Sequence, residues 1–478
     1  MQKPKRVLFV KPPDRFLENE FVYQQLGPHY LQSYLTKHSI ESDILVLHRV
    51  RNHNTDPASS FSSSTKLSDL TMLWIKQDGA TVESSFDEFL FEIYDVVGMS
   101  VMTPQAPDAY LLNQFLKKRY PHIITVIGGS HPRYYQKQVC DLPSNIAFDF
   151  VVPQDGWSPI LKIASGVVER QAGSTILSES IPKLTNLPAP TRPLNLMSRY
   201  NFEIAGVPAY HTITALGCPF TCHFCESGIE RVRMFSESMI AADLTEISNA
   251  HKSLGHEKKG IMFFDDVGLM SPKQVSRLSR SVRKLGFDTW RAFTHAYLVV
   301  KHADSLLKPF IETGGKRIGI GLETGSQRSL DLINKRNGKK QNVEDHYEAV
   351  AIANSLGVAV DAFTMIYPWE DEKDLAETNR LVEYITTSPV KAKDEKGRQM
   401  YNHVDATIMS PYQGTKFFDM IRLGQLPDVE INLDSDPGDY YYKGESGTSG
   451  WPYLKSRLPR SEYVQVQTYR NSLRPSYR

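Results

Sequence analysis

Three of the four cysteines lie within eight positions, in the segment LGCPFTCHFCESG over residues 216–228. They are Cys218, Cys222 and Cys225, and their spacing is C-x3-C-x2-C. A structural zinc site normally takes four ligands, often from two C-x2-C pairs, and the sequence has no second pair. Three thiolates can instead hold a [4Fe–4S] cluster and leave one iron open to an external ligand. The count of three therefore favours a cluster with a free iron.

The composition is that of a globular protein. Its 478 residues are 41% hydrophobic and 23% charged, with a formal net charge of +1. The length predicts two or three domains, and the near-neutral charge gives no reason to expect nucleic acid binding. No apolar run approaches the roughly 20 residues of a membrane-spanning helix, and VLFV near the start is too short for a secretory signal. Four cysteines form no disulfide framework, so we expect a cytoplasmic location.

Short apolar runs alternate with helical segments in the first third of the chain. The apolar runs lie at residues 6–10, 42–47, 94–102 and 122–129. They are continuous rather than alternating, which is typical of buried parallel strands. We therefore predict a doubly wound, Rossmann-like α/β domain over residues 1–165, interrupted at 50–90 by a polar loop or insertion. The Pro-rich stretch IPKLTNLPAPTRPLN predicts a linker over 166–204.

A second α/β series follows the linker. Its predicted strands lie at residues 211–217, 260–266, 289–295, 317–323, 358–367 and 404–410. Six strands are too few for an eight-stranded barrel, so we predict a partial (β/α)6 barrel over residues 205–425. Because the chemistry of such barrels lies at the carboxyl ends of the strands, one mouth should gather Cys218, Asp265, Asp266, Glu323 and Glu370.

Two other features lie outside this pattern. Residues 426–478 form a C-terminal extension rich in aromatic and basic residues, and its run of three tyrosines favours a cap on the barrel over a flexible end. Cys140, the fourth cysteine, is predicted to be a half-buried packing thiol.

The segment CPFTCHFC resembles the signature of the radical S-adenosylmethionine (SAM) enzymes. Companion segments occur in the expected order, namely FFDD, GIGLETGSQRSLDLINK, MIYPWED and PYQGT. The resemblance covers residues 205–425 and implies a [4Fe–4S] cluster held by Cys218, Cys222 and Cys225. It also implies that the open iron chelates the amino and carboxylate groups of SAM. One electron from the cluster would then cleave SAM to a 5′-deoxyadenosyl radical.

The resemblance implies roles for further residues. Phe224 would lie beside the adenine, Asp265 or Asp266 would accept the methionine amino group, and Glu323 and Ser326 would reach the ribose and carboxylate. One of the two aspartates could instead cap a helix or form a salt bridge at the barrel rim.

The family's fifth-strand segment has two glycines where this chain has Ile366 and Trp369. Since glycine allows a backbone to approach a ligand closely, the adenine must pack differently here or use the adjoining backbone. His295, at the end of the third predicted strand, is the candidate for a catalytic contact with substrate, although a rim histidine is more often structural.

The first domain resembles the cobalamin-binding-like domain found upstream of many radical enzymes of this subgroup. The segments that carry the resemblance are KPP, LGPHYLQSYL, VVGMSVMTPQ, VIGGSHPR and DFVVPQDG. A large flat cofactor can fill the crevice beyond the carboxyl ends of parallel strands. The residues that would line it are Gly98, Ser100, Thr103, Gly128 and Gly129. No D-x-H-x-x-G motif occurs, so no histidine of this domain need ligate cobalt, and some relatives of this fold bind no cobalamin.

The resemblance implies a cobalamin-dependent radical SAM enzyme, a methyltransferase that acts on an unactivated carbon of a small molecule, lipid or peptide. It would need an external electron donor such as flavodoxin or ferredoxin. A second interpretation keeps the radical step but performs cyclisation, oxidation or rearrangement without methyl transfer. A third is a non-catalytic iron–sulfur module for electron transfer or sensing, which predicts a fully ligated cluster that does not bind SAM.

Overall fold

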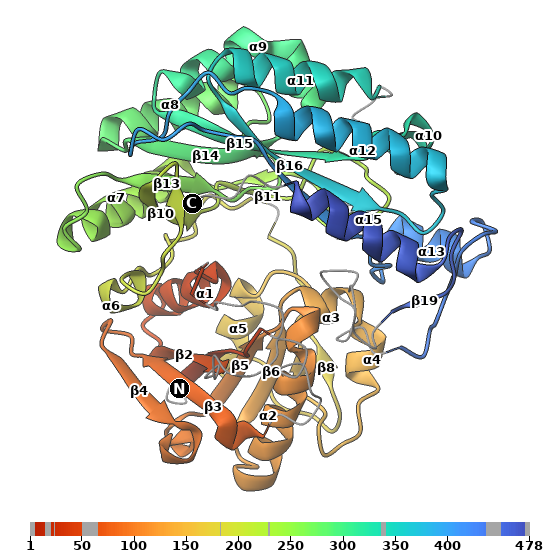
Figure 1. Ribbon diagram of the computed structural model, residues 1–478. Helices are drawn as coiled ribbons and strands as arrows, with labels where there is room; N and C mark the ends of the chain where they lie inside the picture. The colour runs from red at the N-terminus through yellow and green to blue at the C-terminus, as the bar shows by residue number, and fades with distance from the viewer. Residues whose placement is uncertain are drawn as a thin grey trace. The chain divides into compact units, whose positions relative to one another are not determined.

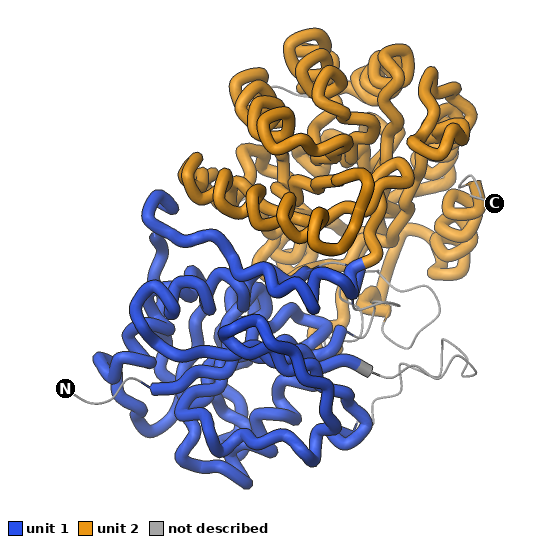
Figure 2. Tube along the Cα trace, turned by 90° about the vertical axis from the view of Figure 1, so that its left-hand side faces the viewer, with its two compact units in different colours: residues 1–200 blue, residues 201–478 orange. Residues whose placement is uncertain are grey.

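The computed structural model describes residues 5–14, 21–22, 24–49, 66–181, 183–227, 230–335, 341–435 and 451–473. Contacts divide the chain into two compact units, residues 1–200 and 201–478, which Figure 2 colours separately. Each unit is built on a large, mainly parallel sheet with helices packed on it (Figure 1). The α/β class predicted from the sequence is therefore confirmed in both units.

Unit 1 has an eight-stranded sheet in the order β4-β3-β2-β1-β5-β6-β7-β8. Its strands are β1 (Val7–Lys11), β2 (Ser42–Arg49), β3 (Leu70–Ile75), β4 (Thr81–Ser85), β5 (Val96–Ser100), β6 (Ile124–Gly128), β7 (Phe150–Val151) and β8 (Thr175–Ile176). All pairs from β2 to β8 are parallel, whereas β3 and β4 are antiparallel additions at one edge. The order reverses between β1 and β5, which is the topological switch point of a doubly wound fold.

Both faces of this sheet are buried. Its helices are α1 (Leu26–Lys37), α2 (Ala106–Arg119), α3 (Ser130–Tyr134), α4 (Gln136–Cys140), α5 (Trp157–Ala164) and α6 (Leu194–Met197), with 3-10 turns at Leu67–Asp69, Phe86–Glu88, Phe91–Ile93 and Thr103–Gln105. In β1, Val7 and Phe9 enter the core that α1 and α5 cover, while Leu8 and Val10 enter the core that α2 covers. Because successive side chains point to opposite faces, a strand buried on both sides shows a continuous apolar run.

Two segments of unit 1 differ from the sequence prediction. Residues 70–85 form the β3–β4 hairpin rather than a loop, because LTMLWI supplies an apolar strand directly after the polar stretch, of which residues 50–65 lie outside the described residues. The predicted linker also packs on unit 1. It contributes β8 to the sheet, and Leu196 of α6 is fully buried in the core beside α1 and α5.

Unit 2 has a seven-stranded sheet in the order β17-β16-β15-β14-β13-β10-β9. Its strands are β9 (Glu203–Ile204), β10 (Val207–Thr212), β13 (Gly260–Phe263), β14 (Thr289–Thr294), β15 (Gly315–Glu323), β16 (Ala359–Ile366) and β17 (His403–Ile408). The six strands from β10 to β17 are parallel and adjacent in chain order, and β9 pairs antiparallel at the edge. The predicted partial barrel of six strands is confirmed.

The helices of unit 2 are α7 (Glu237–Ser253), α8 (Pro272–Leu285), α9 (Ala296–Ile311), α10 (Gln327–Leu332), α11 (Glu344–Ser355), α12 (Glu372–Thr387), α13 (Lys416–Arg422) and α15 (Arg460–Ser472). Figure 1 shows α8, α9, α11 and α12 along one face of the sheet. Short antiparallel pairs join β11 (Ala215–Leu216) to β12 (Arg233–Met234) and β18 (Glu430–Ile431) to β19 (Tyr453–Lys455).

The C-terminal extension packs on unit 2 through its helix. Helix α15 packs on β17 and α12, and Tyr463 shares a core with Ile366, Leu375 and Ile408 on the helix-covered face of the sheet. The tyrosine run on which the cap prediction relied, Tyr440 to Tyr442, lies outside the described residues.

Candidate functional site

The three cysteines lie in the loop between β11 and β12, and each is half-buried. Gly217 enters this loop with a φ of 84°, and a Cβ there would lie 2.7 Å from the Arg231 carbonyl oxygen. Glycine is required at this point because the two ends of the loop cross closely. Burial raises the pKa of the Cys218 thiol to about 11 and that of Cys222 to about 12, and Cys225 adds to both shifts. The thiols are thus close enough to influence one another.

A buried carboxylate holds the segment that leads into the loop. Oδ1 of Asp265 accepts hydrogen bonds from the Thr214 and Ala215 amides at 2.5 and 2.8 Å, and Oδ2 accepts one from Thr214 Oγ1 at 2.8 Å. Gln274 donates to the same hydroxyl at 3.1 Å. Burial raises the pKa of Asp265 to about 6, and the three hydrogen bonds oppose that shift. Asp265 is therefore committed to the backbone of this segment.

Asp266 has a different environment. Its Oδ1 accepts a hydrogen bond from Ser227 Oγ at 3.2 Å, and Ser227 lies two residues after Cys225. Burial raises the pKa of Asp266, and its charge in turn raises the pKa of Cys218. Of the two aspartates, Asp266 is the one that contacts the cysteine loop itself.

The end of β15 carries a buried ion pair. Oε1 of Glu323 lies 2.6 Å from Nζ of Lys335, and Lys335 also donates to the Gly321 carbonyl. Glu323 has a φ of 66°, which a residue other than glycine adopts only when its surroundings hold it there. The Lys335 charge lowers the pKa of Cys218 and Cys222, against the larger opposing effect of burial. Lys335 is a site residue that the sequence analysis missed, although it lies inside the GIGLETGSQRSLDLINK segment.

Ser326 and Glu370 link the ends of β15 and β16. Ser326 caps α10 and donates to Asp374 Oδ1 at 2.5 Å, so its hydroxyl is used within the fold. Glu370 is fully buried and accepts from the Tyr367 amide at 3.1 Å and from Thr324 Oγ1 at 3.2 Å. Burial raises the pKa of Glu370 to about 7.

An aromatic cluster joins the cysteine loop to the end of β16. The Phe224 ring lies 6.4 Å from the Tyr367 ring, Tyr367 stacks on Trp369 at 4.7 Å, and Trp369 contacts Phe417 at 4.7 Å. The Phe417 amide donates to the His223 carbonyl at 2.9 Å. Where the related family has glycines, Trp369 fills this cluster, and Ile366 faces the core beneath α15.

His295 supports the cysteine loop from β14. Its ring stacks on Phe220 with centroids 3.9 Å apart and planes 8° apart, and Nδ1 lies 2.8 Å from Gln341 Nε2. Burial lowers its pKa well below the ordinary value, so the ring is neutral. His295 is only 4% exposed.

The five residues predicted to line the unit 1 crevice do not all lie at strand ends. Ser100 and Gly128 end β5 and β6, and Gly129 has a φ of 99° where a Cβ would lie 2.5 Å from the Val101 oxygen. Gly98 lies inside β5, where a side chain would meet Phe9 and Ile160.

Thr103 is fully buried, and its hydroxyl lies 3.2 Å from His131 Nδ1. Nε2 of His131 lies 2.6 Å from the Tyr110 hydroxyl, so both ring nitrogens are engaged within the protein.

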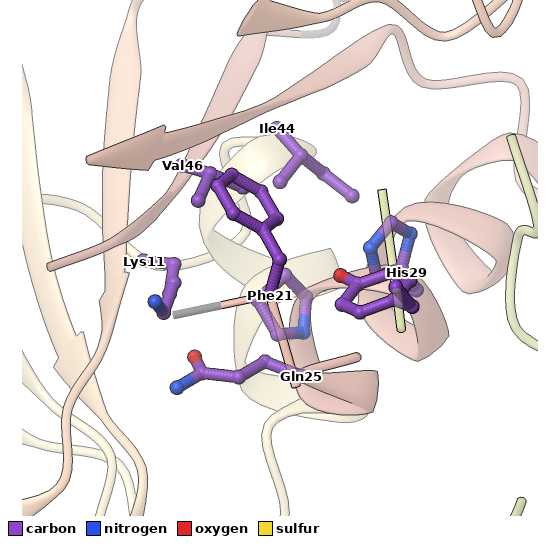
Figure 3. Close-up of a pocket in the computed structure, with 8 residues that line it drawn as sticks. Lys11, Phe21, Gln25, His29, Ile44 and Val46 are labelled. Atoms are coloured by element: carbon purple, nitrogen blue, oxygen red, sulfur yellow. The ribbon is translucent and has the colours of Figure 1, made fainter. Parts of the chain in front are cut away.

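A small pocket opens beside α1 at the edge where β1 ends (Figure 3). Lys11, Gln25 and His29 meet the apolar side chains of Phe21, Ile44 and Val46 there. Nδ1 of His29 lies 2.8 Å from Thr191 Oγ1, and burial lowers the pKa of His29 to about 3. None of the five residues predicted for the crevice lines this pocket.

The donor set is of the type that iron–sulfur clusters use. Within the described ranges, no three His, Cys, Asp or Glu side chains are grouped as a site for one metal ion. The three thiols on this loop are only half-buried, so iron atoms could reach them, and thiolate is the ligand that iron–sulfur clusters use. None of the described helices is both long enough and apolar enough to cross a membrane.

Part of the second unit matches the model of a known protein family. Residues 212–382 match the family model described as the radical SAM superfamily. These residues are a radical SAM domain. The match begins at the last residue of β10 and ends within α12, so it takes in the cysteine loop, the two aspartates and the Glu323–Lys335 pair.

Two curated relatives are similar to this chain over more than half of its length. A protein of Pyrococcus horikoshii named as an uncharacterized methyltransferase is 24% identical over 68% of this chain and 69% of its own length. An anaerobic magnesium-protoporphyrin IX monomethyl ester cyclase of Rubrivivax gelatinosus is 22% identical over 60% of this chain and 54% of its own length.

Two solved structures share the fold over 98% of this chain. One is the cobalamin-dependent SAM radical enzyme OxsB with aqua-cobalamin and SAM bound, with a TM-score of 0.69, 15% identity and 66% of its chain covered. The other is the radical SAM methyltransferase TsrM of Kitasatospora setae with cobalamin and a [4Fe–4S] cluster bound, with a TM-score of 0.61, 11% identity and 91% covered. The fold of this chain is thus shared with OxsB and TsrM over nearly all of its length.

The two aspartates should respond differently to substitution. Asp265→Ala leaves two amides and a hydroxyl without their acceptor, so we expect a loss of about 3 kcal/mol in unfolding free energy and poor iron retention. Asp265→Asn keeps one oxygen for both amides and should retain most iron. Asp266→Ala should change stability by less than about 1 kcal/mol but weaken SAM binding. Urea unfolding, iron content and titration calorimetry measure these effects, and a reversed order of stability would contradict the assignment.

Removal of the Lys335 charge should be costly. Lys335→Met leaves Glu323 as a buried charge without its partner, so we expect a loss of about 3 kcal/mol in unfolding free energy. The matched control, Lys373→Met on the exposed side of α12, should change stability by no more than about 0.5 kcal/mol. Urea unfolding of both variants tests this. Equal losses of unfolding free energy would show that the Lys335–Glu323 ion pair adds no stability beyond that of an exposed lysine.

Proposed function

We propose that the chain is a cobalamin-dependent radical SAM methyltransferase that acts on an unactivated carbon of a small molecule, lipid or peptide. The observation that carries the proposal is the loop of three thiols at the carboxyl edge of a six-stranded parallel sheet, within a matched radical SAM domain. Three protein ligands would leave one iron for the amino and carboxylate groups of SAM.

The chain's own residues would bind and orient the reactants. Cys218, Cys222 and Cys225 would hold a [4Fe–4S] cluster, which when bound supplies the electron that cleaves SAM to a 5′-deoxyadenosyl radical. Asp266, which contacts the loop at Ser227, would accept a hydrogen bond from the methionine ammonium group, and its negative charge would strengthen that bond.

Other site residues would shape the pocket around SAM. Glu323 is fixed by Lys335 at the end of β15, where its second carboxylate oxygen can accept a ribose hydroxyl. Phe224, which lies beside the buried Tyr367 ring, offers aromatic surface that would exclude water from the adenine. The positive charge of Lys335, near Cys218 and Cys222, favours their thiolate forms.

Unit 1 would hold cobalamin, which when bound supplies the methyl group that is transferred. The support is the switch point of the sheet, the shared fold with OxsB and TsrM, and the strand ends at Ser100 and Gly128. His131 has both nitrogens engaged with Thr103 and Tyr110, so this residue would not ligate cobalt. An external reductant such as flavodoxin or ferredoxin would deliver the electrons.

A second candidate is a radical cyclase of the same architecture. The similarity to the anaerobic magnesium-protoporphyrin IX monomethyl ester cyclase favours it. Both candidates require the cluster and SAM, and they differ in whether the methyl group of SAM reaches the product.

The cluster assignment predicts different behaviour for two cysteines. Cys222→Ala, reconstituted anaerobically, should lose the cluster absorbance and SAM cleavage, because two thiolates cannot hold the cluster in place. Cys140→Ala, at the end of α4 in unit 1, should keep both. Absorbance spectra and 5′-deoxyadenosine formation are the measurements. A Cys222→Ala protein that retained both would refute the proposal.

The methyl transfer assignment is tested with SAM labelled in its methyl group. Anaerobic incubation with reductant, cobalamin and candidate substrates should place the label in a product if the chain is a methyltransferase. Formation of 5′-deoxyadenosine with unlabelled product would favour the cyclase class, and cobalamin analysis of the anaerobically purified protein would support or remove the cofactor.

A further inference from the structure

Helix α15 occupies the free edge of the unit 2 sheet. The outermost parallel strand is β17, and its Ala406 amide donates to Asn471 Oδ1 at 3.0 Å. The Ala406 carbonyl accepts from Asn471 Nδ2 at 3.0 Å and from Gln467 Nε2 at 3.2 Å. These side chains satisfy edge groups that would otherwise face solvent or another chain, so α15 is fixed in register with the sheet.

The same helix holds the turn that follows β16. Tyr463 is fully buried, and its hydroxyl contacts the carbonyl oxygens of Pro368 at 3.1 Å and Glu370 at 3.0 Å. The hydroxyl also accepts from the Leu458 amide at 3.0 Å, and the Arg457 amide donates to the Pro368 oxygen at 2.7 Å. The turn over residues 368–370 is therefore bound to the C-terminal extension by several hydrogen bonds.

Arg470, one turn from the end of α15, is a buried cation. Its Nε donates to Asn379 Oδ1 at 2.8 Å and one terminal nitrogen donates to the Leu375 carbonyl at 3.1 Å. The other terminal nitrogen is buried without a hydrogen-bond partner. The Arg470 charge lowers the pKa of Glu370, against the larger effect of burial. The charge thus acts on the carboxylate that ends the turn.

The opposite side of the turn faces the cysteine loop. Tyr367 and Trp369 flank Pro368 and stack on each other, and Tyr367 lies beside Phe224. Trp369 contacts Phe417, whose amide binds the His223 carbonyl. A continuous path of contacts therefore runs from α15 through the turn to the two residues between Cys222 and Cys225.

We infer that α15 is a positioning element for SAM, and that Tyr463 sets the affinity for SAM by fixing the turn over residues 368–370, while Arg470 holds α15 on α12, the helix that follows this turn. The inference rests on the proposed function, since the adenine would lie beside Phe224 and this turn. With tryptophan and isoleucine in place of the family's glycines, the backbone of the turn cannot adjust freely around the adenine. The C-terminal extension would hold the turn in the conformation that a glycine-rich turn adopts only when the ligand binds.

The test uses a conservative pair of variants on one helix. Tyr463→Phe removes the buried hydroxyl and keeps the ring, whereas Tyr469→Phe removes a hydroxyl that donates to Glu383 on the exposed side of α15. The full-length protein is reconstituted anaerobically, and SAM affinity is measured by titration calorimetry together with iron content and thermal midpoint. We expect Tyr463→Phe to weaken SAM binding about three- to tenfold and Tyr469→Phe to leave it unchanged.

A second pair separates charge from packing. Arg470→Met removes the charge and should weaken SAM binding at least as much as Tyr463→Phe, whereas Arg470→Lys keeps the charge and should recover part of the affinity. If Tyr463→Phe and Arg470→Met lower the thermal midpoint but bind SAM as the unaltered protein does, α15 is a stabilising element only and the inference is overturned. If the unaltered protein itself binds no SAM, the proposed function fails first.

Discussion

The geometry of the cysteine loop depends on one buried carboxylate, that of Asp265. The loop between β11 and β12 has little regular structure of its own, so its thiols can be held in place only by bonds to neighbouring elements. Asp265 accepts three hydrogen bonds from Thr214 and from Ala215, the first residue of β11. Burying a carboxylate is costly, and these hydrogen bonds to its charged form offset that cost. The position of the loop is therefore fixed by a residue at the carboxyl end of β13.

Three further contacts complete the same arrangement from other strands. The Phe220 ring stacks on neutral His295, which directly follows β14, and the His223 carbonyl accepts from the Phe417 amide. Lys335 binds Gly321 and Glu323 at the end of β15. The supports thus come from the ends of β13, β14 and β15 and from α13, and a parallel barrel brings such strand ends together at one edge. The N-terminal unit has its own switch point, and His131 within it is occupied by Thr103 and Tyr110.

The strands and the cysteine motif could be predicted from the sequence because they depend on local patterns. Continuous apolar runs indicated the six parallel strands, and C-x3-C-x2-C indicated the donor set. The different roles of Asp265 and Asp266 could not be predicted, because they depend on Thr214, about fifty positions earlier. Lys335 was missed since a lysine after a helical segment is ordinarily exposed. The position of α15 depends on side chains that reach Ala406 and Pro368, which no periodicity encodes.

The central claim is that one iron of the cluster is left for SAM. Electron paramagnetic resonance of the anaerobically reconstituted and reduced protein, recorded with and without SAM, tests it most directly. We predict that SAM changes the signal of the reduced cluster, and that isotope labels in its amino and carboxylate groups couple to the cluster. A spectrum of a fully ligated cluster that SAM leaves unchanged would contradict the account.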